Sequence, residues 1–287
     1  MTQSLKLTSP KVVQEILQSQ GLRPRKRFGQ NFLCDENIVT KIINAAELTP
    51  SESVLEIGGG LGTLTQQIAG SSQDVAVIEI DSDLVPILKN NLAGFPNVRV
   101  IHDDALKLNW KSLFPDKKRF KCLGNLPYNI TAPLLEKLIE TRSRIEFAIW
   151  MLQIEVAQKI TAPVGTRETS SLGIFVQSFC DVKILFRVSQ NAFFPKPEVG
   201  SAVLRISPLT QPRFHASDES FQRIVRSSFG MRRKTLYRAL CMAPQLNLTP
   251  EQVRSMLSNA CIEESRRGET LSIDEFDRIA QQLDFLA

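Results

Sequence analysis

The chain has 287 residues, of which 43% are hydrophobic and 23% are charged. These are ordinary values for a folded protein, and the length predicts one large domain plus a smaller one. No apolar run reaches the roughly 18 residues that a membrane-spanning helix needs, and the first residues lack the basic-then-apolar pattern of a secretory signal. We therefore expect a cytoplasmic protein with no membrane segment.

Basic residues exceed acidic residues by 35 to 30, and they are clustered along the chain. Clustered cations suit a polyanion such as RNA, although solvated surface charge explains them equally simply. The clusters are Arg23, Arg25, Lys26 and Arg27; Lys117, Lys118 and Arg119; Arg232, Arg233 and Lys234; and Arg266 and Arg267.

The five cysteines are an odd number, lie far apart and include no Cys-x-x-Cys pair. This pattern is typical of reduced, mostly buried thiols in the cytosol. The two histidines, His102 and His215, do not lie near a cysteine at ligand spacing. We therefore expect no metal site.

Before residue 50, Asp35 can cap a helix that runs through Ala46, with Ile38, Ile42 and Ile43 on its buried face. From Ser53 to Leu152, short apolar runs alternate with amphipathic stretches, as in parallel strands covered on both faces. This alternation predicts an α/β fold with a doubly wound, Rossmann-like sheet. Strands are expected at Val54–Ile57, Val75–Ile80, Val98–Ile101, Phe120–Leu123 and Phe147–Leu152, and helices include Leu84–Leu92 and Leu134–Glu140.

The C-terminal third has a different pattern. Two further strands, Val182–Val188 and Ser201–Ile206, are expected to form a hairpin-like pair at one sheet edge, joined by the Pro-rich loop Asn191–Gly200. A linker-like stretch at Pro208–Pro212 follows. We therefore predict a large domain over 1–207 and a small helical domain over 208–287. Its expected helices are Asp218–Phe229, Arg232–Met242, Thr249–Ala260 and Ser272–Leu283; Pro250 and the capping box Ser272–Glu275 mark two starts.

A Gly-rich turn follows the first expected strand of the sheet. Gly58, Gly60 and Gly62 allow a sharp turn and a close approach to a ligand. Thr63 breaks the spacing of the dinucleotide fingerprint, Gly-x-Gly-x-x-Gly. The turn therefore fits a nucleoside ligand without phosphate, such as S-adenosylmethionine, at least as well as a dinucleotide.

Two carboxylates follow the next two strands, where nucleoside ligands bind in this fold class. Glu79 can accept hydrogen bonds from both ribose hydroxyls, and Asp104 can accept one from an adenine amino group. Their neighbours Asp81 and Asp103 are expected to be surface acids. Three successive strand ends thus predict a nucleoside site.

The loop after the fourth strand reads Gly124-Asn-Leu-Pro-Tyr-Asn-Ile130. An adenine amine is a poor nucleophile because its lone pair is delocalised into the ring, and hydrogen-bond acceptors can localise that lone pair. The side-chain oxygen of Asn125 and the carbonyl of Leu126 are suitable acceptors, and Pro127 fixes the backbone. Tyr128 offers a ring on which an extruded base can stack.

With these motifs the sequence resembles the ribosomal small-subunit RNA adenine dimethyltransferases, from about Arg25 to Ala280. The lead-in Phe28-Gly-Gln-Asn-Phe-Leu33 and the full match of Asn125–Thr131 to the family's catalytic loop carry the resemblance. It implies a class I methyltransferase that binds S-adenosylmethionine. It also implies cofactor contacts at Asn31, Leu33, Gly58, Glu79, Asp104 and Asn125, with Gln30 and Phe32 close by and Gly60 in the same loop.

Later segments extend the resemblance. The pattern Phe-x-Pro-x-Pro-x-Val-x-Ser-x-Val begins at Phe193, which by resemblance lines the target-adenine pocket. Phe229–Leu236 is similar to the family's basic helix, and the closing segment includes Arg267. We therefore expect RNA contacts from Arg25, Lys26, Arg27, Arg232, Arg233, Lys234 and Arg267.

The resemblance implies a substrate as well. It is a pair of adjacent adenosines in a hairpin loop near the 3′ end of small-subunit rRNA, in an assembling subunit, each receiving two methyl groups. We expect the protein to act as a monomer. The family usually has Pro at position 59, where this chain has Gly59. Cofactor affinity is the property that we expect this departure to affect.

Three alternatives remain open at the level of sequence. A resistance-type methyltransferase of large-subunit rRNA shares the main motifs, although Asn129-Ile-Thr131 and Arg232–Leu236 favour the small-subunit interpretation. A glutamine or DNA-adenine methyltransferase usually carries Pro where this chain has Leu126. A non-catalytic RNA-binding or assembly factor is the alternative of another class, and the intact Asn125, Tyr128 and Glu79 argue that catalysis is retained.

Overall fold

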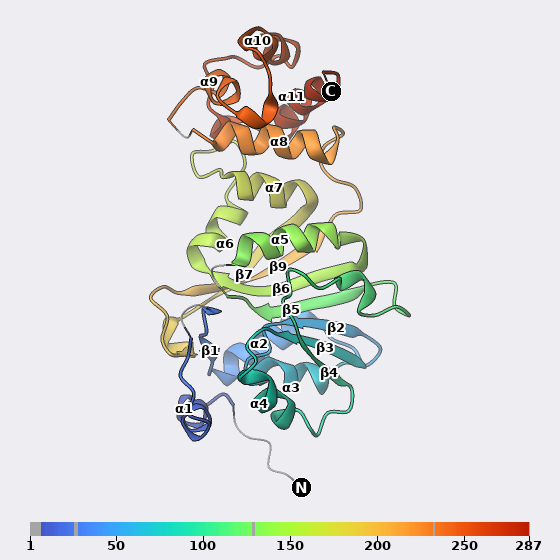
Figure 1. The fold of residues 1–287 in the computed structure, drawn as a ribbon, viewed down its shortest axis with the longest axis vertical. Coiled ribbons are helices and arrows are strands. Elements are labelled where there is room, and N and C mark those ends of the chain that lie inside the picture. Colours follow the sequence, from blue (N-terminus) through green and yellow to red (C-terminus); the bar gives the residue numbers. More distant parts are fainter. Residues whose placement is uncertain (1–6, 26–27, 128–129, 232, 287) are drawn as a thin grey trace. The chain divides into compact units, whose positions relative to one another are not determined.

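The computed structural model describes residues 7–25, 28–127, 130–231 and 233–286, and its main feature is a seven-stranded sheet of order β4-β3-β2-β5-β6-β9-β7 (Figure 1). Pairing is parallel from β4 to β6, and β9 joins β6 in the antiparallel direction. The predicted doubly wound α/β class is confirmed. The strands are β2 (Ser53–Ile57), β3 (Asp74–Glu79), β4 (Val98–His102), β5 (Phe120–Asn125), β6 (Ile145–Gln153), β7 (Cys180–Val188) and β9 (Ser201–Pro208).

Each strand expected from an apolar run is present, with ends that differ by a few residues. The run from residue 120 continues through Asn125, which is thus the last residue of β5. β7 forms the sheet edge and β9 lies between it and β6. The two last strands are therefore neighbours at one edge, as predicted.

Helices of the first part of the chain pack on the sheet through apolar residues. In α2, Asp35 caps the helix by accepting a hydrogen bond from the Ile38 amide, as predicted. The buried face differs from the expectation: Val39, Ile42 and Ala46 are buried, whereas Ile38 and Ile43 pack at its margin. These helices are α2 (Glu36–Ala46), α3 (Thr63–Ala69), α4 (Leu84–Asn91) and α5 (Thr131–Glu140).

A short antiparallel ribbon ties the N-terminal segment to the loop expected at 191–200. Its strands are β1 (Phe32–Leu33) and β8 (Phe193–Phe194), with Phe32 opposite Phe194 and Leu33 opposite Phe193. Helix α1 (Pro10–Ser19) packs against this ribbon through Val13 and Leu17. The Pro-rich loop is thus partly a strand, because the backbone of residues 32–34 supplies its hydrogen-bond partners.

The C-terminal helices are α8 (Asp218–Phe229), α9 (Leu236–Cys241), α10 (Pro250–Asn259) and α11 (Ile273–Asp284). The capping box predicted at Ser272 is present, and Thr249 forms a second one with Gln252. The helix expected over 232–242 begins later than predicted. The Thr235 side chain accepts from the Arg238 amide and caps α9 there, so Arg233 and Lys234 precede the helix.

By their internal contacts, the residues form two compact units: 1–157 with 183–208, and 158–182 with 209–287. The second unit includes α7 (Ser171–Phe179) and the second half of α6 (Ile154–Thr161), two helices that the sequence analysis did not identify. The functional division at residue 207 stays a prediction.

None of the helices in the described parts of the chain is both long and apolar enough to cross a membrane. The thiols of Cys34, Cys122 and Cys180 are buried, whereas Cys241 is half-buried and Cys261 is exposed.

We expect that Ser272→Ala lowers the free energy of unfolding by about 1 kcal/mol, because it removes the side-chain acceptor of the capping box. Ser258→Ala, at an exposed position inside α10, is the matched control and should change stability little. Chemical denaturation of both variants measures the difference. Equal stabilities would contradict a role for this cap.

Candidate functional site

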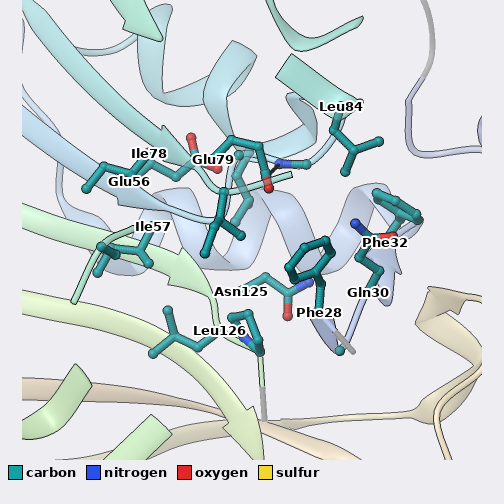
Figure 2. A pocket seen from close by; sticks show the side chains of 18 of the residues that line it. Phe28, Gln30, Phe32, Glu56, Ile57, Ile78, Glu79, Leu84, Asn125 and Leu126 are labelled. Atoms are coloured by element: carbon teal, nitrogen blue, oxygen red, sulfur yellow. Dashed lines mark hydrogen bonds between the residues drawn. The ribbon is translucent and has the colours of Figure 1, made fainter. Parts of the chain in front are cut away.

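The C-terminal ends of three parallel strands lie level with one another. Ile57 at the end of β2 is in register with Ile78 of β3 and with Gly124 of β5. The loops that follow these strands open into one pocket of roughly 960 Å³, mouth included (Figure 2), a size suited to a cofactor. Its walls come from within residues 28–33, 56–64, 78–84, 103–105 and 125–127, with residue 130.

The glycine loop lines the pocket. Gly58, Gly60 and Gly62 have φ values of 78°, 56° and 96°, a region in which other residues are strained. The Gly58 amide donates to the Ile78 carbonyl at 2.9 Å, which joins the loop to β3. Both Gly58 and Gly60 line the pocket, at positions that the sequence assigned to cofactor binding.

Glu79 lies at the end of β3 and faces the pocket. One carboxylate oxygen accepts from the Gly60 amide at 2.8 Å and the other from the Asp81 amide at 2.9 Å. Burial raises the pKa of Glu79, and these two amides partly offset the rise. Each oxygen retains a lone pair, so two neighbouring ribose hydroxyls can donate to one carboxylate.

Asp81 is not the surface acid that the sequence suggested. Only 3% of its surface is exposed, because it accepts hydrogen bonds from Arg25 Nη1 at 2.9 Å and from Gln30 Nε2 at 2.6 Å. Arg25 also pairs with Asp83. The guanidinium of Arg25, expected to contact RNA, is thus engaged within the protein and holds the lead-in segment against the end of β3.

Asp104 follows β4 and borders the pocket, where its Oδ1 accepts from the Leu106 amide at 2.9 Å. Ile80 lies on the same side and leaves 45% of its surface exposed, which is unusual for an isoleucine next to a buried carboxylate. The apolar side chain of Ile80 suits the face of an adenine, and the Asp104 acceptor beside it suits the amino group of that base. Asp103 is exposed, as expected.

The lead-in segment closes another side of the pocket. Gln30, Asn31 and Leu33, which the resemblance places near the cofactor, all line it. The Gln30 Oε1 atom accepts from the Arg25 amide at 2.7 Å while its Nε2 donates to Asp81. Gln30 therefore holds this wall in place through its hydrogen bonds to Arg25 and Asp81.

Asn125 connects the lead-in with the catalytic loop. Its Nδ2 donates to the Asn31 carbonyl at 2.9 Å, an orientation that makes Oδ1 the remaining acceptor of the amide. No hydrogen bond to Oδ1 is recorded among the described residues. Figure 2 shows the Asn125 side chain next to Phe28, whose role the sequence analysis had not considered.

The rest of the catalytic loop is partly described. Leu126 and Pro127 line the pocket, and the Leu126 amide is tied to the Met151 carbonyl at 3.1 Å. Tyr128 lies outside the described residues. Phe193 is buried in the core next to Leu33 rather than on the pocket wall, so its contact with a target base stays a prediction.

Glu56, which the sequence analysis did not single out, also lines the pocket. It sits in the middle of an apolar strand and only 1% of its surface is exposed. Burial raises the pKa of Glu56 to about 8, the Thr65 hydroxyl partly offsets the rise, and the charge of Glu79 adds to it. A carboxyl group within a run of strand residues was the sequence signal, because such a position is costly without a purpose.

The basic residues expected to contact RNA are spread over both units. Lys26, Arg27 and Arg232 lie outside the described residues, whereas Arg233, Lys234 and Arg267 are exposed in the second unit. Arg267 approaches Glu269 at 3.9 Å, a separation at which an exposed pair contributes little. No cluster of three metal-ligating side chains is found in the parts of the chain that the structure describes.

Comparison with known proteins identifies a family. Residues 21–284 match the sequence model described as "Ribosomal RNA adenine dimethylase". The chain is 43% identical over 284 residues to a protein of Pelotomaculum thermopropionicum named ribosomal RNA small subunit methyltransferase A, covering 96% of each chain. It is 40% identical over 267 residues to a protein of the same name from Clostridium botulinum, covering 93% of this chain and 96% of that one.

Two solved structures share the fold over most of the chain. A dimethyladenosine transferase from Plasmodium falciparum is 28% identical with a TM-score of 0.70, covering 85% of this chain and 94% of that chain. The 23S rRNA methyltransferase ErmE is 27% identical with a TM-score of 0.65, covering 88% of this chain and 100% of that chain.

Gly59 is closely packed rather than loose. A Cβ at this position would lie 2.5 Å from Cγ2 of Val77 and 2.8 Å from Cδ2 of Leu88, both buried. We expect Gly59→Ala to destabilise the protein by about 1–3 kcal/mol, as overpacking does, and to weaken cofactor binding. Gly94→Ala is the control, because nothing lies within 4 Å of its Cβ. Thermal unfolding and cofactor titration measure both effects. A Gly59→Ala variant with the same stability and cofactor affinity as the native protein would contradict this packing.

Glu56→Gln should stabilise the ligand-free protein, increasingly as pH rises. Below pH 4.5 the carboxyl is protonated in both states; between 4.5 and about 8 only the folded state keeps the proton, so the free energy of unfolding falls with pH. Glutamine does not titrate. The difference in melting temperature from the native protein should be small at pH 5 and largest near pH 8. Exposed Glu146→Gln is the control, and a difference independent of pH would refute the assignment.

Proposed function

Because the chain belongs to the ribosomal RNA adenine dimethylase family, we propose that it dimethylates two adjacent adenosines in a hairpin loop near the 3′ end of small-subunit rRNA. The methyl donor is S-adenosylmethionine. One observation carries the proposal: Asn125 presents an amide oxygen at the same pocket in which Gly60 and Glu79 form a nucleoside-binding wall. Acceptor and cofactor site are thus adjacent.

The residues of the pocket fit this cofactor. Glu79 holds the ribose hydroxyls, Asp104 accepts from the adenine amino group, and Ile80 covers an apolar face of the base. The glycine loop allows the amino-acid part to lie close to the backbone, and Asn31 and Leu33 border it. When bound, the cofactor supplies an activated methyl group on a sulfonium centre.

The target amine needs acceptors rather than a strong base, because the neutral amine is the attacking form. Asn125 Oδ1 and the Leu126 carbonyl accept hydrogen bonds from its N–H groups and direct its lone pair toward the methyl group. Pro127 fixes the loop, while Tyr128 and Phe193 stack on or border the extruded base. Positioning and electrostatics then provide most of the rate.

The substrate class follows from the relatives named above, which carry the name of a small-subunit methyltransferase. Unstacked loop bases are cheap to extrude, and RNA readers generally target such loops. Arg233, Lys234 and Arg267 are exposed and contact phosphates of the surrounding rRNA, together with Lys26, Arg27 and Arg232. Arg25 contributes by holding Gln30 and the lead-in in place. The protein acts in the cytoplasm, as a monomer, on an assembling small subunit.

We expect Asn125→Ala to reduce methyl transfer by about 100-fold or more, the size of effect seen when one preorganised polar group is lost from an active site. Cofactor affinity should fall less, because the other walls of the pocket remain. Asn90→Ala, exposed at the end of α4, is the control. Transfer of labelled methyl groups and cofactor titration separate the two effects. Methyl transfer by Asn125→Ala at the native rate would show that Asn125 has no role in catalysis.

The substrate is tested by incubating the protein with labelled S-adenosylmethionine and under-methylated small ribosomal subunits, followed by mapping of the methylated bases. Large subunits and bare DNA are the controls. Dimethyladenosine at two adjacent loop positions supports the proposal. Label in large-subunit rRNA would favour a resistance-type enzyme, and absence of label with cofactor bound would favour a binding or assembly factor.

A further inference from the structure

The orientation of the Asn125 amide depends on one backbone carbonyl. Its Nδ2 atom donates to the Asn31 carbonyl at 2.9 Å, which leaves Oδ1 as the acceptor of the amide. An amide rotated by half a turn would present N–H donors at the place of Oδ1, and a donor cannot localise the lone pair of a target amine. The proposed reaction therefore requires that the Asn31 carbonyl stays in place.

The backbone of Asn31 is held from both sides. On its C-terminal side, Phe32 begins β1 and pairs with Phe194 of β8. On its N-terminal side, the side chain of Gln30 reaches the segment that follows β3, where its Nε2 donates to Asp81 Oδ2 at 2.6 Å. A carbonyl between two fixed neighbours has little freedom to move, so the Gln30 side chain transmits the position of β3 to this carbonyl.

Asp81 is a suitable anchor because it is itself fixed by several hydrogen bonds. It is buried, and its Oδ1 accepts from Arg25 Nη1 at 2.9 Å and from the Asp83 amide at 3.1 Å. The backbone amide of Asp81 donates to Glu79 Oε1 at 2.9 Å. One residue is thus joined directly to the expected ribose acceptor and, through Gln30, to the lead-in.

The hydrogen bond between Gln30 and Asp81 has a fixed direction. While Nε2 of Gln30 donates to the Asp81 carboxylate, its Oε1 accepts from the Arg25 amide at 2.7 Å. Both ends of the Gln30 amide are therefore engaged. Rotating this amide by half a turn would place two acceptors opposite each other at Asp81 and two donors at Arg25.

We propose that Gln30 and Asp81 are positioning residues for the methyl transfer. Their hydrogen bond holds the Asn31 carbonyl, and this carbonyl orients the Asn125 amide. The inference rests on the proposed function, in which Asn125 Oδ1 accepts from the target amine. A pair that only shaped the cofactor wall would affect cofactor affinity, whereas a pair that orients Asn125 sets the rate at which bound substrates react.

The test exchanges the donor and the acceptor of this pair. Gln30→Glu places a second carboxylate against Asp81, and Asp81→Asn places an amide donor against the donor of Gln30. In the double variant the side chain at position 81 donates and the one at position 30 accepts, so the hydrogen bond returns in the opposite direction. The double variant also keeps the net charge of the native protein.

We expect each single variant to transfer methyl groups about tenfold to 100-fold more slowly when cofactor and small ribosomal subunits are saturating, because a small misplacement of a reacting group has a cost of this size. The double variant should recover most of the rate. Affinity for S-adenosylhomocysteine, measured by calorimetry, should change less than the rate. Asp116→Asn and Gln211→Glu, both at exposed positions, repeat the two changes of charge and should react at the native rate.

Two further variants separate positioning from a general structural role. Gln30→Ala removes the hydrogen bond without adding a charge and should slow transfer in the same way, which keeps the test decisive if a charged variant does not fold. In a protein that already carries Asn125→Ala, Gln30→Ala should slow transfer little further, because the group that it positions is gone. Such non-additivity is the mark of residues that act through one another.

Native rates at saturation in the Gln30 and Asp81 variants would overturn the proposal, even if cofactor affinity fell. So would a double variant that stays as slow as the single variants, or an equal effect of Gln30→Ala with and without Asn125→Ala. Failure of the native protein to methylate small ribosomal subunits would instead overturn the proposed function. The two failures are therefore distinguishable.

Discussion

The register of three parallel strands is the constraint on which the rest of this structure depends. Ile57, Ile78 and Gly124 lie level, so three loops begin at the same edge of the sheet. Gly124 permits this alignment, because a Cβ there would lie 2.8 Å from the Ile57 carbonyl oxygen. Ligands bind at this edge in open α/β sheets because the loops diverge there and leave a crevice.

Hydrogen bonds between loops then fix the walls of the crevice. Glu79 holds the glycine loop through Gly60, Asp81 holds the lead-in through Arg25 and Gln30, and Asn125 holds the lead-in from the other side through the Asn31 carbonyl. Segments distant in sequence thus constrain one another. A site held in this way is arranged before the ligand arrives, which lowers the cost of ordering it on binding.

Acidic side chains line the pocket, whereas basic residues are exposed outside it. Glu56, Glu79 and Asp104 line a pocket in a chain whose formal net charge is +5. A cationic cofactor suits the interior, and a polyanion such as RNA suits the exposed basic residues. Of the carboxyl groups that line the pocket, Glu56 and Glu79 are the most buried, and their pKa values are raised chiefly because burial disfavours their charged forms. The pocket is therefore sensitive to the charge of what enters it.

The sequence by itself determined the alternation of strands and helices, the glycine loop, and the acids and the amide at successive strand ends. These features are local: apolar runs, helix caps such as Asp35 and Ser272, and positions where only glycine is unstrained. It did not determine that β8 pairs with β1 within the expected loop at 191–200, or that α9 begins after Thr235. Backbone pairing and capping depend on which partner or competing start the folded chain provides.

The tertiary structure alone decided the roles of Arg25, Asp81 and Glu56. Its basic neighbours made Arg25 look like an RNA contact, and Asp81 was expected to be a surface acid. The two residues, 56 positions apart in the sequence, instead pair with each other, with Arg25 half-buried and Asp81 buried. Glu56 was one residue of an apolar strand until the fold enclosed it and left one oxygen without a partner among the described residues. The reason is physical: burial and partnership depend on contacts between distant segments, and a charge acquires its role from what surrounds it.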